Sequence, residues 1–200
     1  MPIYKPKFQN NFGLLFLKTM VEDSLILQKF EDEKTRHEAF SMLLNKYQQK
    51  VYWHIRRIVI NHDDTDDLVQ DVFIKVWKNL GNFRQDSQLY TWLYRIATNE
   101  SITFLNKKKS KNNIPIDDLS EELSSSLNEE NYFSGDAIQK KLQQALLTLP
   151  TKQKLVFNMK YFENMKFQEI SDVLGTSVGA LKASYHLAVK KIEHHLLSTD

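Results

Sequence analysis

The fold of this chain is decided by a stretch near its C-terminus that reads FQEISDVLGTSVGALK, residues 167–182. Its first half carries apolar residues at the spacing of one helix face, namely Ile170, Val173 and Leu174. Gly175 follows, and glycine readily takes the left-handed backbone that ends many helices. Ser177 then stands where its side chain can cap a second helix. The pattern predicts two helices joined by a sharp turn. This is either an ordinary helical hairpin or a helix-turn-helix that places its second helix in the major groove of DNA.

The second helix of this motif is predicted to have two different faces. Its apolar face carries Val178, Leu181, Tyr185, Ala188 and Ile192. Its outward face, together with the capping serine, presents Ser177, Gly179, Ala180, Lys182, Ala183, His186 and Lys190. On a DNA-binding helix the small residues would let the backbone approach base pairs and the lysines would meet phosphates; the alternative is a solvated face. No arginine follows Gly135, so this helix lacks the commonest guanine-reading side chain.

The composition favours an all-α protein. The 200 residues are 42% hydrophobic and include five glycines and four prolines, and apolar positions recur with the helical period over long stretches. The net charge is +2, so nucleic-acid binding would depend on local basic patches rather than on overall charge. The chain has no cysteine, which excludes disulfides and thiolate chemistry and suits a reducing cytoplasm.

Breaks in the periodicity predict two small helical domains joined by a flexible linker. An N-terminal extension over residues 1–19 has an unclear role, and we expect it to be dispensable or Met20 to be the natural start. The first domain covers residues 20–106, the linker residues 107–135, and the second domain, which contains the helix-turn-helix, residues 136–200. The N-terminal apolar run is too short to span a bilayer and no cleavage site follows it. We therefore expect a cytoplasmic protein without membrane insertion.

Four aspartates in the first domain raise the question of a metal site. They are Asp63, Asp64, Asp66 and Asp67. A calcium loop needs a glycine at its turn, which is absent here, so we interpret the cluster as the start of a helix that is capped by Asp64 or Thr65 and ends at Gly81. The adjacent His194 and His195 point apart on a helix, and no nucleophile or phosphate-loop motif occurs. The sequence therefore predicts a protein that is not an enzyme and has no catalytic residue, metal or cofactor.

A polar loop and a further helix follow in the first domain. The exposed face of this helix is expected to carry Thr91, Tyr94, Arg95 and Thr98. A mixture of rings and cations suits single-stranded nucleic acid, because bases stack on rings and phosphates pair with arginine. The loop, with Asn82, Phe83 and Arg84, could receive a flipped base. For the nearby Tyr90 and Trp92 the alternative is a place in the core, which we favour for Trp92 because it lies on the apolar face.

Three segments resemble conserved parts of bacterial RNA polymerase sigma factors. The helix DDLVQDVFIKVW, residues 66–77, resembles their polymerase-binding helix. Residues 82–99 resemble the loop and helix that read the −10 promoter element, and residues 149–191 resemble the domain that reads the −35 element. The order and the two-domain size are similar to the extracytoplasmic-function (ECF) group. The resemblance covers about residues 22–197.

This resemblance implies a subunit that binds core RNA polymerase and directs promoter-specific transcription initiation. It assigns polymerase contacts to Asp67, Gln70, Asp71 and Ile74. It assigns contacts with the melted −10 element to Asn82, Phe83, Arg84, Ser87, Tyr94, Arg95 and Asn99. The duplex −35 element would be read by the outward face of the last helix, defined above from Ser177 to Lys190. The implied partners are core polymerase, promoter DNA and an anti-sigma factor.

Two departures from the family pattern and two alternative functions accompany this interpretation. Ser184 and Leu187 stand where family members usually carry basic residues, and residues 1–19 match nothing in the pattern. A stand-alone helix-turn-helix regulator would explain residues 136–197 but neither of the two earlier segments. A metal-dependent hydrolase built on the aspartates is a third possibility, which metal analysis of the pure protein would test.

Overall fold

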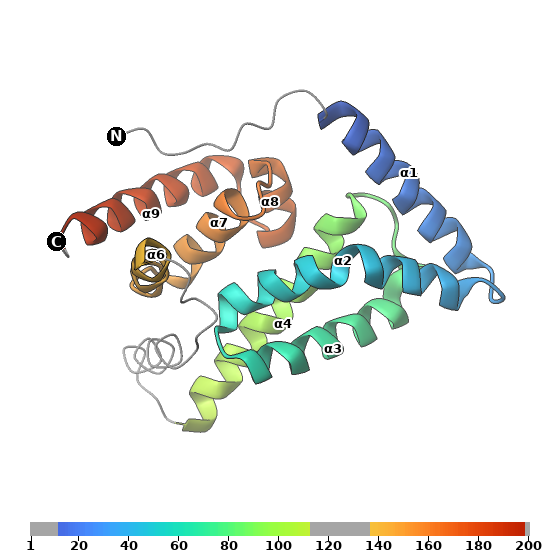
Figure 1. Ribbon diagram of the computed structural model, residues 1–200, viewed down its shortest axis with the longest axis horizontal. Coiled ribbons are helices and arrows are strands. Elements are labelled where there is room, and N and C mark those ends of the chain that lie inside the picture. The colour runs from blue at the N-terminus through green and yellow to red at the C-terminus, as the bar shows by residue number, and fades with distance from the viewer. Residues whose placement is uncertain (1–11, 113–136, 199–200) are drawn as a thin grey trace.

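The computed structural model describes residues 12–112 and 137–198, and within these ranges all regular structure is helical. The helices are α1 (Phe12–Glu31), α2 (Arg36–Val59), α3 (His62–Asn79), the short 3₁₀ helix η1 (Leu80–Asn82), α4 (Leu89–Asn112), α6 (Ala137–Leu147), α7 (Thr151–Tyr161), α8 (Phe167–Leu174) and α9 (Val178–Ser198). Helices α1 to α4 form one bundle and α6 to α9 a second, as Figure 1 shows. The predicted all-α class is confirmed.

The boundaries of the helices differ from expectation at three places. Helix α1 begins at Phe12 and runs without a break through the boundary expected after residue 19. Helix α4 extends to Asn112, so the first residues of the predicted linker are helical, and the rest of that linker lies outside the described residues. Helix α3 begins at His62 rather than near Asp66, because Asn61 is its cap: the Asn61 Oδ1 accepts a hydrogen bond of 2.9 Å from the Asp64 backbone N–H. The predicted cap at Asp64 or Thr65 is therefore wrong.

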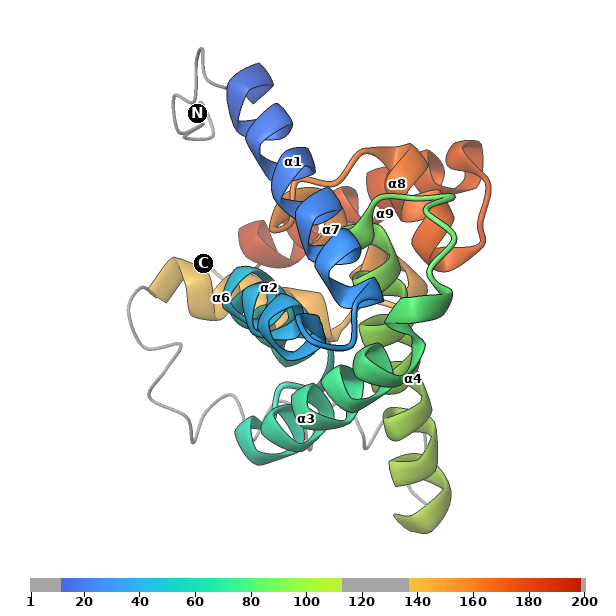
Figure 2. The ribbon, with the colours of Figure 1, turned by 90° about the vertical axis from the view of Figure 1, so that its right-hand side faces the viewer.

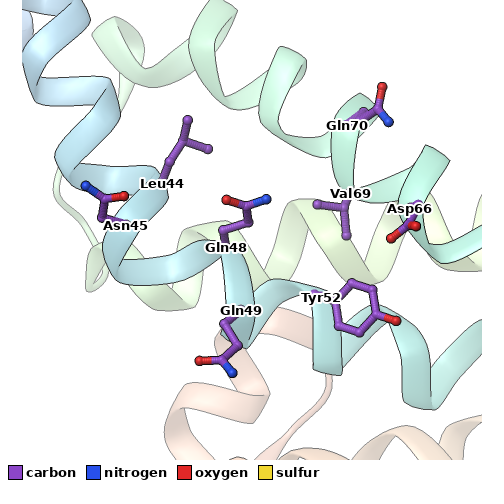
Figure 3. A pocket seen from close by; sticks show the side chains of 8 residues that line it. All are labelled: Leu44, Asn45, Gln48, Gln49, Tyr52, Asp66, Val69 and Gln70. Atoms are coloured by element: carbon purple, nitrogen blue, oxygen red, sulfur yellow. The ribbon is translucent and has the colours of Figure 1, made fainter. Parts of the chain in front are cut away.

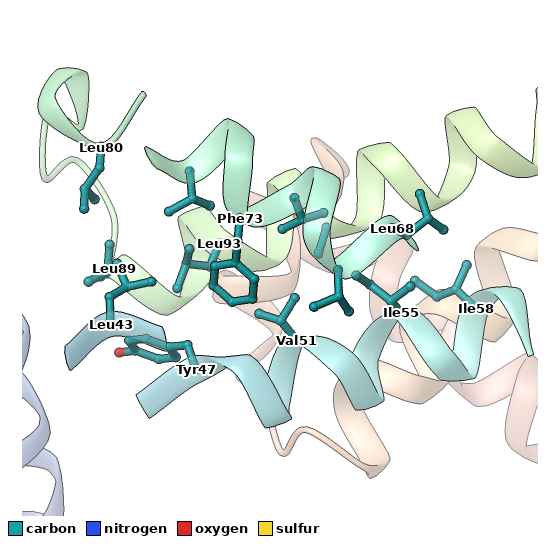
Figure 4. Close-up of a cluster of buried hydrophobic side chains, with 14 of the residues drawn as sticks. Leu43, Tyr47, Val51, Ile55, Ile58, Leu68, Phe73, Leu80, Leu89 and Leu93 are labelled. Carbon is teal, nitrogen blue, oxygen red and sulfur yellow. The ribbon is translucent and has the colours of Figure 1, made fainter. Parts of the chain in front are cut away.

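The core of the first bundle lies between α2, α3 and α4 (Figure 4). Helix α2 contributes buried side chains at the helical period, which are Leu43, Tyr47, Val51, Ile55 and Ile58. Leu68, Phe73 and Leu80 come from α3 and η1, and Leu89 and Leu93 from α4. Helix α1 joins this core through Ile26 and Phe30. The Trp77 ring packs edge-on against Phe30 and Phe40, with centroids 5.4 and 5.0 Å apart. It thereby ties α1 and α2 to α3, and such pairs contribute about 0.5–1.5 kcal/mol each beyond burial.

The second bundle contains the predicted helix-turn-helix as α8 and α9. Gly175 ends α8 in the left-handed conformation, with φ of 62°, and its N–H bonds to the Ser171 carbonyl. The Ser177 hydroxyl accepts a long hydrogen bond of 3.4 Å from the Ala180 N–H at the start of α9. Both predictions about this turn are confirmed. Ile170 and Val173 of α8 are buried together with Leu181 of α9, as the apolar spacing indicates.

The two bundles lie against each other. Helix α4 contacts α8, and α2 contacts α7; Figure 2 shows α8 beside the upper part of α4. Each bundle contributes a buried side chain to the apolar cluster of the other. Tyr94 of α4 belongs to the cluster of the second bundle, and Leu155 of α7 belongs to that of the first.

Candidate functional site

One face of α3 presents the side chains that the sequence assigns to polymerase binding. Asp67, Gln70, Asp71 and Ile74 are all exposed, and Ile74 exposes 52% of its surface although it is aliphatic. The opposite face of the same helix, with Val72 and Val76, is fully buried. Asp67, Gln70 and Asp71 are expected to point away from the apolar seam of this helix and do so, and together with Ile74 they form one continuous acidic and apolar strip.

A hollow of about 470 Å³ lies beside this strip, between α2 and α3 (Figure 3). Its lining comprises Leu44, Asn45, Gln48, Gln49, Tyr52, Asp66, Val69 and Gln70. The residues from α2 were missed by the sequence analysis. Their signal was present: amides at Asn45, Gln48 and Gln49 recur at helical spacing beside the apolar seam of α2. A polar hollow lined mainly by amides, with the single carboxylate of Asp66, next to an exposed aliphatic residue suits a protein partner.

The loop before α4 presents a partly exposed aromatic ring. Phe83 is half-buried, and its ring packs on Trp92 with centroids 5.3 Å apart. Asn82 and Arg84 on either side are exposed, and Ser87 is half-buried. Trp92, expected in the core, is half-buried and packs against the core from its edge. Phe83, supported from behind by Trp92, provides a stacking surface at the rim of the bundle.

The expected exposed face of α4 is wrong for three of its four residues. Thr91, Tyr94 and Thr98 are buried, with exposures of 1, 4 and 1%. Only Arg95 is exposed, together with Asn99 one turn further along. Helical periodicity groups these residues on one side of α4, but it does not show whether that side is exposed. That side is covered by α2 and by the second bundle, which the sequence pattern of a single helix does not reveal.

A buried hydrogen-bonded chain runs from α2 into this face of α4. The Thr98 hydroxyl donates to the Tyr94 carbonyl at 2.7 Å, so His54 Nε2 must donate to Thr98 Oγ1 at 2.8 Å. Burial lowers the pKa of His54 to about 3, and the nearby Arg57 adds to this, so the imidazole is neutral. His54 Nδ1 has no hydrogen-bond partner among the described residues.

The second bundle engages α4 through polar contacts as well. The Tyr94 hydroxyl donates to Glu163 Oε2 at 2.8 Å, and both N–H donors on one side of the Arg95 guanidinium reach the Asp172 carbonyl, Nε at 2.8 Å. Burial raises the pKa of Tyr94, and the Glu163 carboxylate adds to the rise. Burial also raises the pKa of Glu163 despite the opposing charge of Arg57. The structure therefore joins both Tyr94 and Arg95 to the second bundle, with Tyr94 buried and Arg95 exposed.

The outward face of α9 is open. Ser177, Gly179, Ala180, Lys182, Ala183, His186 and Lys190 are all exposed. Leu187, which departs from the family pattern, lies on the same face with 49% of its surface exposed. An open hollow of about 640 Å³ continues beside it, lined by Thr148, Leu187, Lys190, Lys191, His194, His195 and Ser198. Small residues therefore lie near the start of this face and basic residues further along it.

Two of the four aspartates at the start of α3 lie beside basic side chains. Asp64 pairs with Lys108 at 3.2 Å, and Asp66 lies 3.7 Å from His62. Within the described ranges, no three His, Asp or Glu side chains gather closely enough to hold a metal ion. In the same part of the chain, no helix combines the length and apolarity needed to cross a bilayer.

Family models match both bundles in chain order. The model of sigma-70 region 2 matches residues 43–111, and that of sigma-70 region 4 matches residues 139–192. Similar proteins include the RNA polymerase sigma-H factor of Pseudomonas aeruginosa, 28% identical over 186 residues, which covers 89% of this chain and 95% of that protein. The ECF sigma factor SigW of Bacillus subtilis is 29% identical over 162 residues, covering 77% of this chain and 87% of its own length.

Solved structures show the same fold. The sigma factor RpoE in complex with the anti-sigma factor NepR from Bartonella quintana matches with a TM-score of 0.64 at 20% identity, over 78% of this chain and 96% of that one. CnrH in complex with the cytosolic domain of CnrY matches with a TM-score of 0.65 at 23% identity, over 90% of this chain and 99% of that one. Two sigma-70 regions in the right order on two helical bundles, with ECF sigma factors among the relatives, show that this chain belongs to the ECF group of RNA polymerase sigma factors.

Proposed function

We propose that this sigma factor binds core RNA polymerase through the exposed strip of α3 and the adjoining α2 hollow. The observation that carries the proposal is the position of Ile74, an exposed aliphatic side chain on the same helix face as Asp67, Gln70 and Asp71. An exposed aliphatic side chain among polar groups, beside a hollow, gives the mixture of apolar and polar contacts found in protein interfaces. The proposed role is that of a specificity subunit in the cytoplasm, where the chain selects promoters and leaves the chemistry to the polymerase.

The two bundles divide the promoter between them in this proposal. Asn82, Phe83, Arg84 and Ser87 form the site for an extruded base of the melted −10 element, and Tyr94, Arg95 and Asn99 hold the strand beside it. The outward face of α9, from Ser177 to Lys190, binds the duplex −35 element. The stacking position of Phe83 on Trp92 and the open, partly basic face of α9 support this division.

A protein antagonist is the further proposed partner. The structural neighbours RpoE and CnrH were solved with the anti-sigma factor NepR and with the cytosolic domain of CnrY, respectively. The similarity of fold makes an anti-sigma factor the expected regulator of this chain as well. A stand-alone DNA-binding regulator would leave the α3 strip without a role.

A binding titration with core polymerase tests the proposal. The double substitution Asp67→Ala and Gln70→Ala removes two contacts from the strip, and we expect it to weaken polymerase binding by about tenfold or more. The melting temperature should stay nearly unchanged, because both residues are exposed. The matched control is Gln28→Ala with Glu31→Ala, a glutamine and an acid exposed on α1. Equal affinity of both double variants and the unaltered chain would remove the α3 assignment.

A further inference from the structure

A buried carboxylate joins the two bundles. Glu163 lies in the turn between α7 and α8, and its side chain is only 10% exposed. Its Oε1 lies 2.5 Å from Arg57 Nη1 of α2, and its Oε2 accepts the Tyr94 hydroxyl of α4 at 2.8 Å. The Arg57 guanidinium also lies over the Phe162 ring, 4.5 Å from its centroid. One side chain of the second bundle thus pairs with two helices of the first.

Arg95 makes another polar contact between the bundles. Its guanidinium donates to the backbone carbonyl of Asp172, which lies in the last turn of α8. The last carbonyls of a helix have no partner within the helix and carry the negative end of its dipole, so a cation there is stabilising. Arg95 therefore caps the end of α8 from another bundle. In this arrangement its Nε and one Nη2 donor bond to protein, which fixes the direction of the exposed guanidinium.

Apolar packing closes the same interface. The Tyr94 ring belongs to the cluster around the turn of the helix-turn-helix, with Val156, Met159, Met165, Ile170, Val173 and Leu181. Burial raises the pKa of Tyr90, one turn earlier on α4, and the Glu169 carboxylate of α8 adds to the rise. Helix α8 therefore covers the part of α4 that carries Tyr90, Tyr94 and Arg95.

The other proposed contact surfaces remain open in this arrangement. The α3 strip is exposed, and so is the outward face of α9. Asn99, one turn beyond Arg95, is exposed as well. The closed arrangement thus covers part of the strand-binding face while it leaves the polymerase and duplex faces accessible.

We propose that the chain is autoinhibited: α8 and the turn before it mask the strand-binding face of α4, and Glu163 with Arg57 is the latch that holds them there. This inference rests on the proposed role of α4 in binding the −10 strand. Opening would expose the buried Tyr94 ring and release the two Arg95 donors that bond to the Asp172 carbonyl, so that both side chains could contact DNA. The latch is suited to an adjustable equilibrium, because the attraction between two largely buried charges is largely offset by the hydration they regain on opening.

The latch can be tested without DNA, because the chain has no cysteine of its own. Cysteines introduced at Lys78 of α3 and Lys191 of α9, both exposed, accept a donor and an acceptor dye that report the separation of the bundles. Glu163→Ala leaves Arg57 and the Tyr94 hydroxyl without the carboxylate, and we expect the ratio of open to closed molecules to rise about tenfold or more. Glu193→Ala removes an exposed carboxylate from α9 and should leave the energy transfer unchanged.

Strand binding provides the second measurement. A pool of single-stranded oligonucleotides of about 15 nucleotides, long enough for the usual site sizes, should bind Glu163→Ala about tenfold more tightly than the unaltered chain. Adding Arg95→Ala should abolish that gain. Unchanged energy transfer in Glu163→Ala would overturn the latch alone. Opened molecules without a gain in strand affinity would overturn the autoinhibition together with the −10 assignment of α4. If circular dichroism shows that Glu163→Ala is unfolded, Glu163→Gln and Arg57→Gln take its place with the same expectations.

Discussion

His54 makes the stability of the first bundle depend on pH. Its pKa of about 3 in the fold lies below the ordinary value of 6.5, because the ring is buried. Between these two values the unfolded chain takes up a proton that the native chain does not bind. The contribution of the neutral His54 to the free energy of unfolding is therefore fully present above pH 6.5. It is lost as the pH falls towards 3, by up to about 1.4 kcal/mol per pH unit.

The substitution His54→Leu should reduce this pH dependence. In urea titrations at several pH values from 7 down to 4, we expect the slope of the unfolding free energy against pH to be shallower by about 1 kcal/mol per unit. His194→Leu, on the exposed side of α9, is the matched control and should keep the original slope. Identical slopes for all three proteins would mean that His54 is not held neutral by the fold.

Asn99 and Lys182 should affect different steps of promoter opening. Asn99 is exposed on α4, where its amide can both donate to and accept from a base edge, whereas Lys182 is exposed on α9 and offers charge to a phosphate. Asn99→Ala should impair strand opening, measured by permanganate reactivity, more than duplex affinity, and a pre-melted bubble should rescue it. Lys182→Ala should lower duplex affinity and reduce its salt dependence by about one counterion. Equal duplex defects in both variants without rescue would contradict the division of labour between the bundles.

At the scale of elements, the turn between α8 and α9 offers a matched pair of glycines. An added Cβ would meet nothing within 4 Å at either Gly175 or Gly179, so packing does not distinguish the two positions. Gly175 has a φ of 62°, whereas Gly179 lies within α9. Gly175→Ala should destabilise the protein by about 1–2 kcal/mol, and Gly179→Ala should stabilise it by about 0.5 kcal/mol. Urea titrations measure both, and a stabilised Gly175→Ala would contradict the left-handed turn.

Features that depend on neighbouring residues were predicted correctly from the sequence, whereas features that depend on contacts between distant segments were not. Gly175 and Ser177 act within a few residues of their positions, so the sequence alone located the turn correctly. Asn61, Asp64 and Thr65 are all good capping residues, and the sequence offered no way to choose among them before the end of α2 was known. Tyr94 and Thr98 were predicted on the exposed face of α4, and the structure buries both. Their burial depends on His54 and Glu163, which are 40 and 69 residues away from Tyr94 along the chain.

At the scale of the whole molecule, polymerase and promoter together should open the chain. The α3 strip is exposed in the closed arrangement, so docking on polymerase does not require opening first. Under the proposed −10 assignment, holding the strand does require opening, because Tyr94 and Arg95 bond to α8 and the turn before it. A ligand shifts a conformational equilibrium by its differential affinity for the two states. The doubly labelled chain should therefore lose energy transfer when core polymerase and promoter DNA are both added.

The double variant Asp67→Ala and Gln70→Ala provides the control for this shift. It should need a higher polymerase concentration for the same loss of transfer, because its docking strip is weakened. Productive transcription with undiminished energy transfer would show that the closed arrangement persists in the initiating complex.

The hydrogen bond from Arg95 to α8 is accepted by a main-chain oxygen, so its two ends respond differently to amino-acid substitution. Every amino acid at position 172 supplies the same carbonyl, so codon changes there leave the acceptor in place. In random mutagenesis, substitutions at position 172 should therefore leave this hydrogen bond intact, whereas substitutions at position 95 should remove it. The side chains on the surface of α8 can therefore vary in evolution while the hydrogen bond from Arg95 to the carbonyl of residue 172 is retained. Replacing the peptide bond after residue 172 by an ester, through chemical synthesis, would weaken this acceptor, which no amino-acid substitution at position 172 can do.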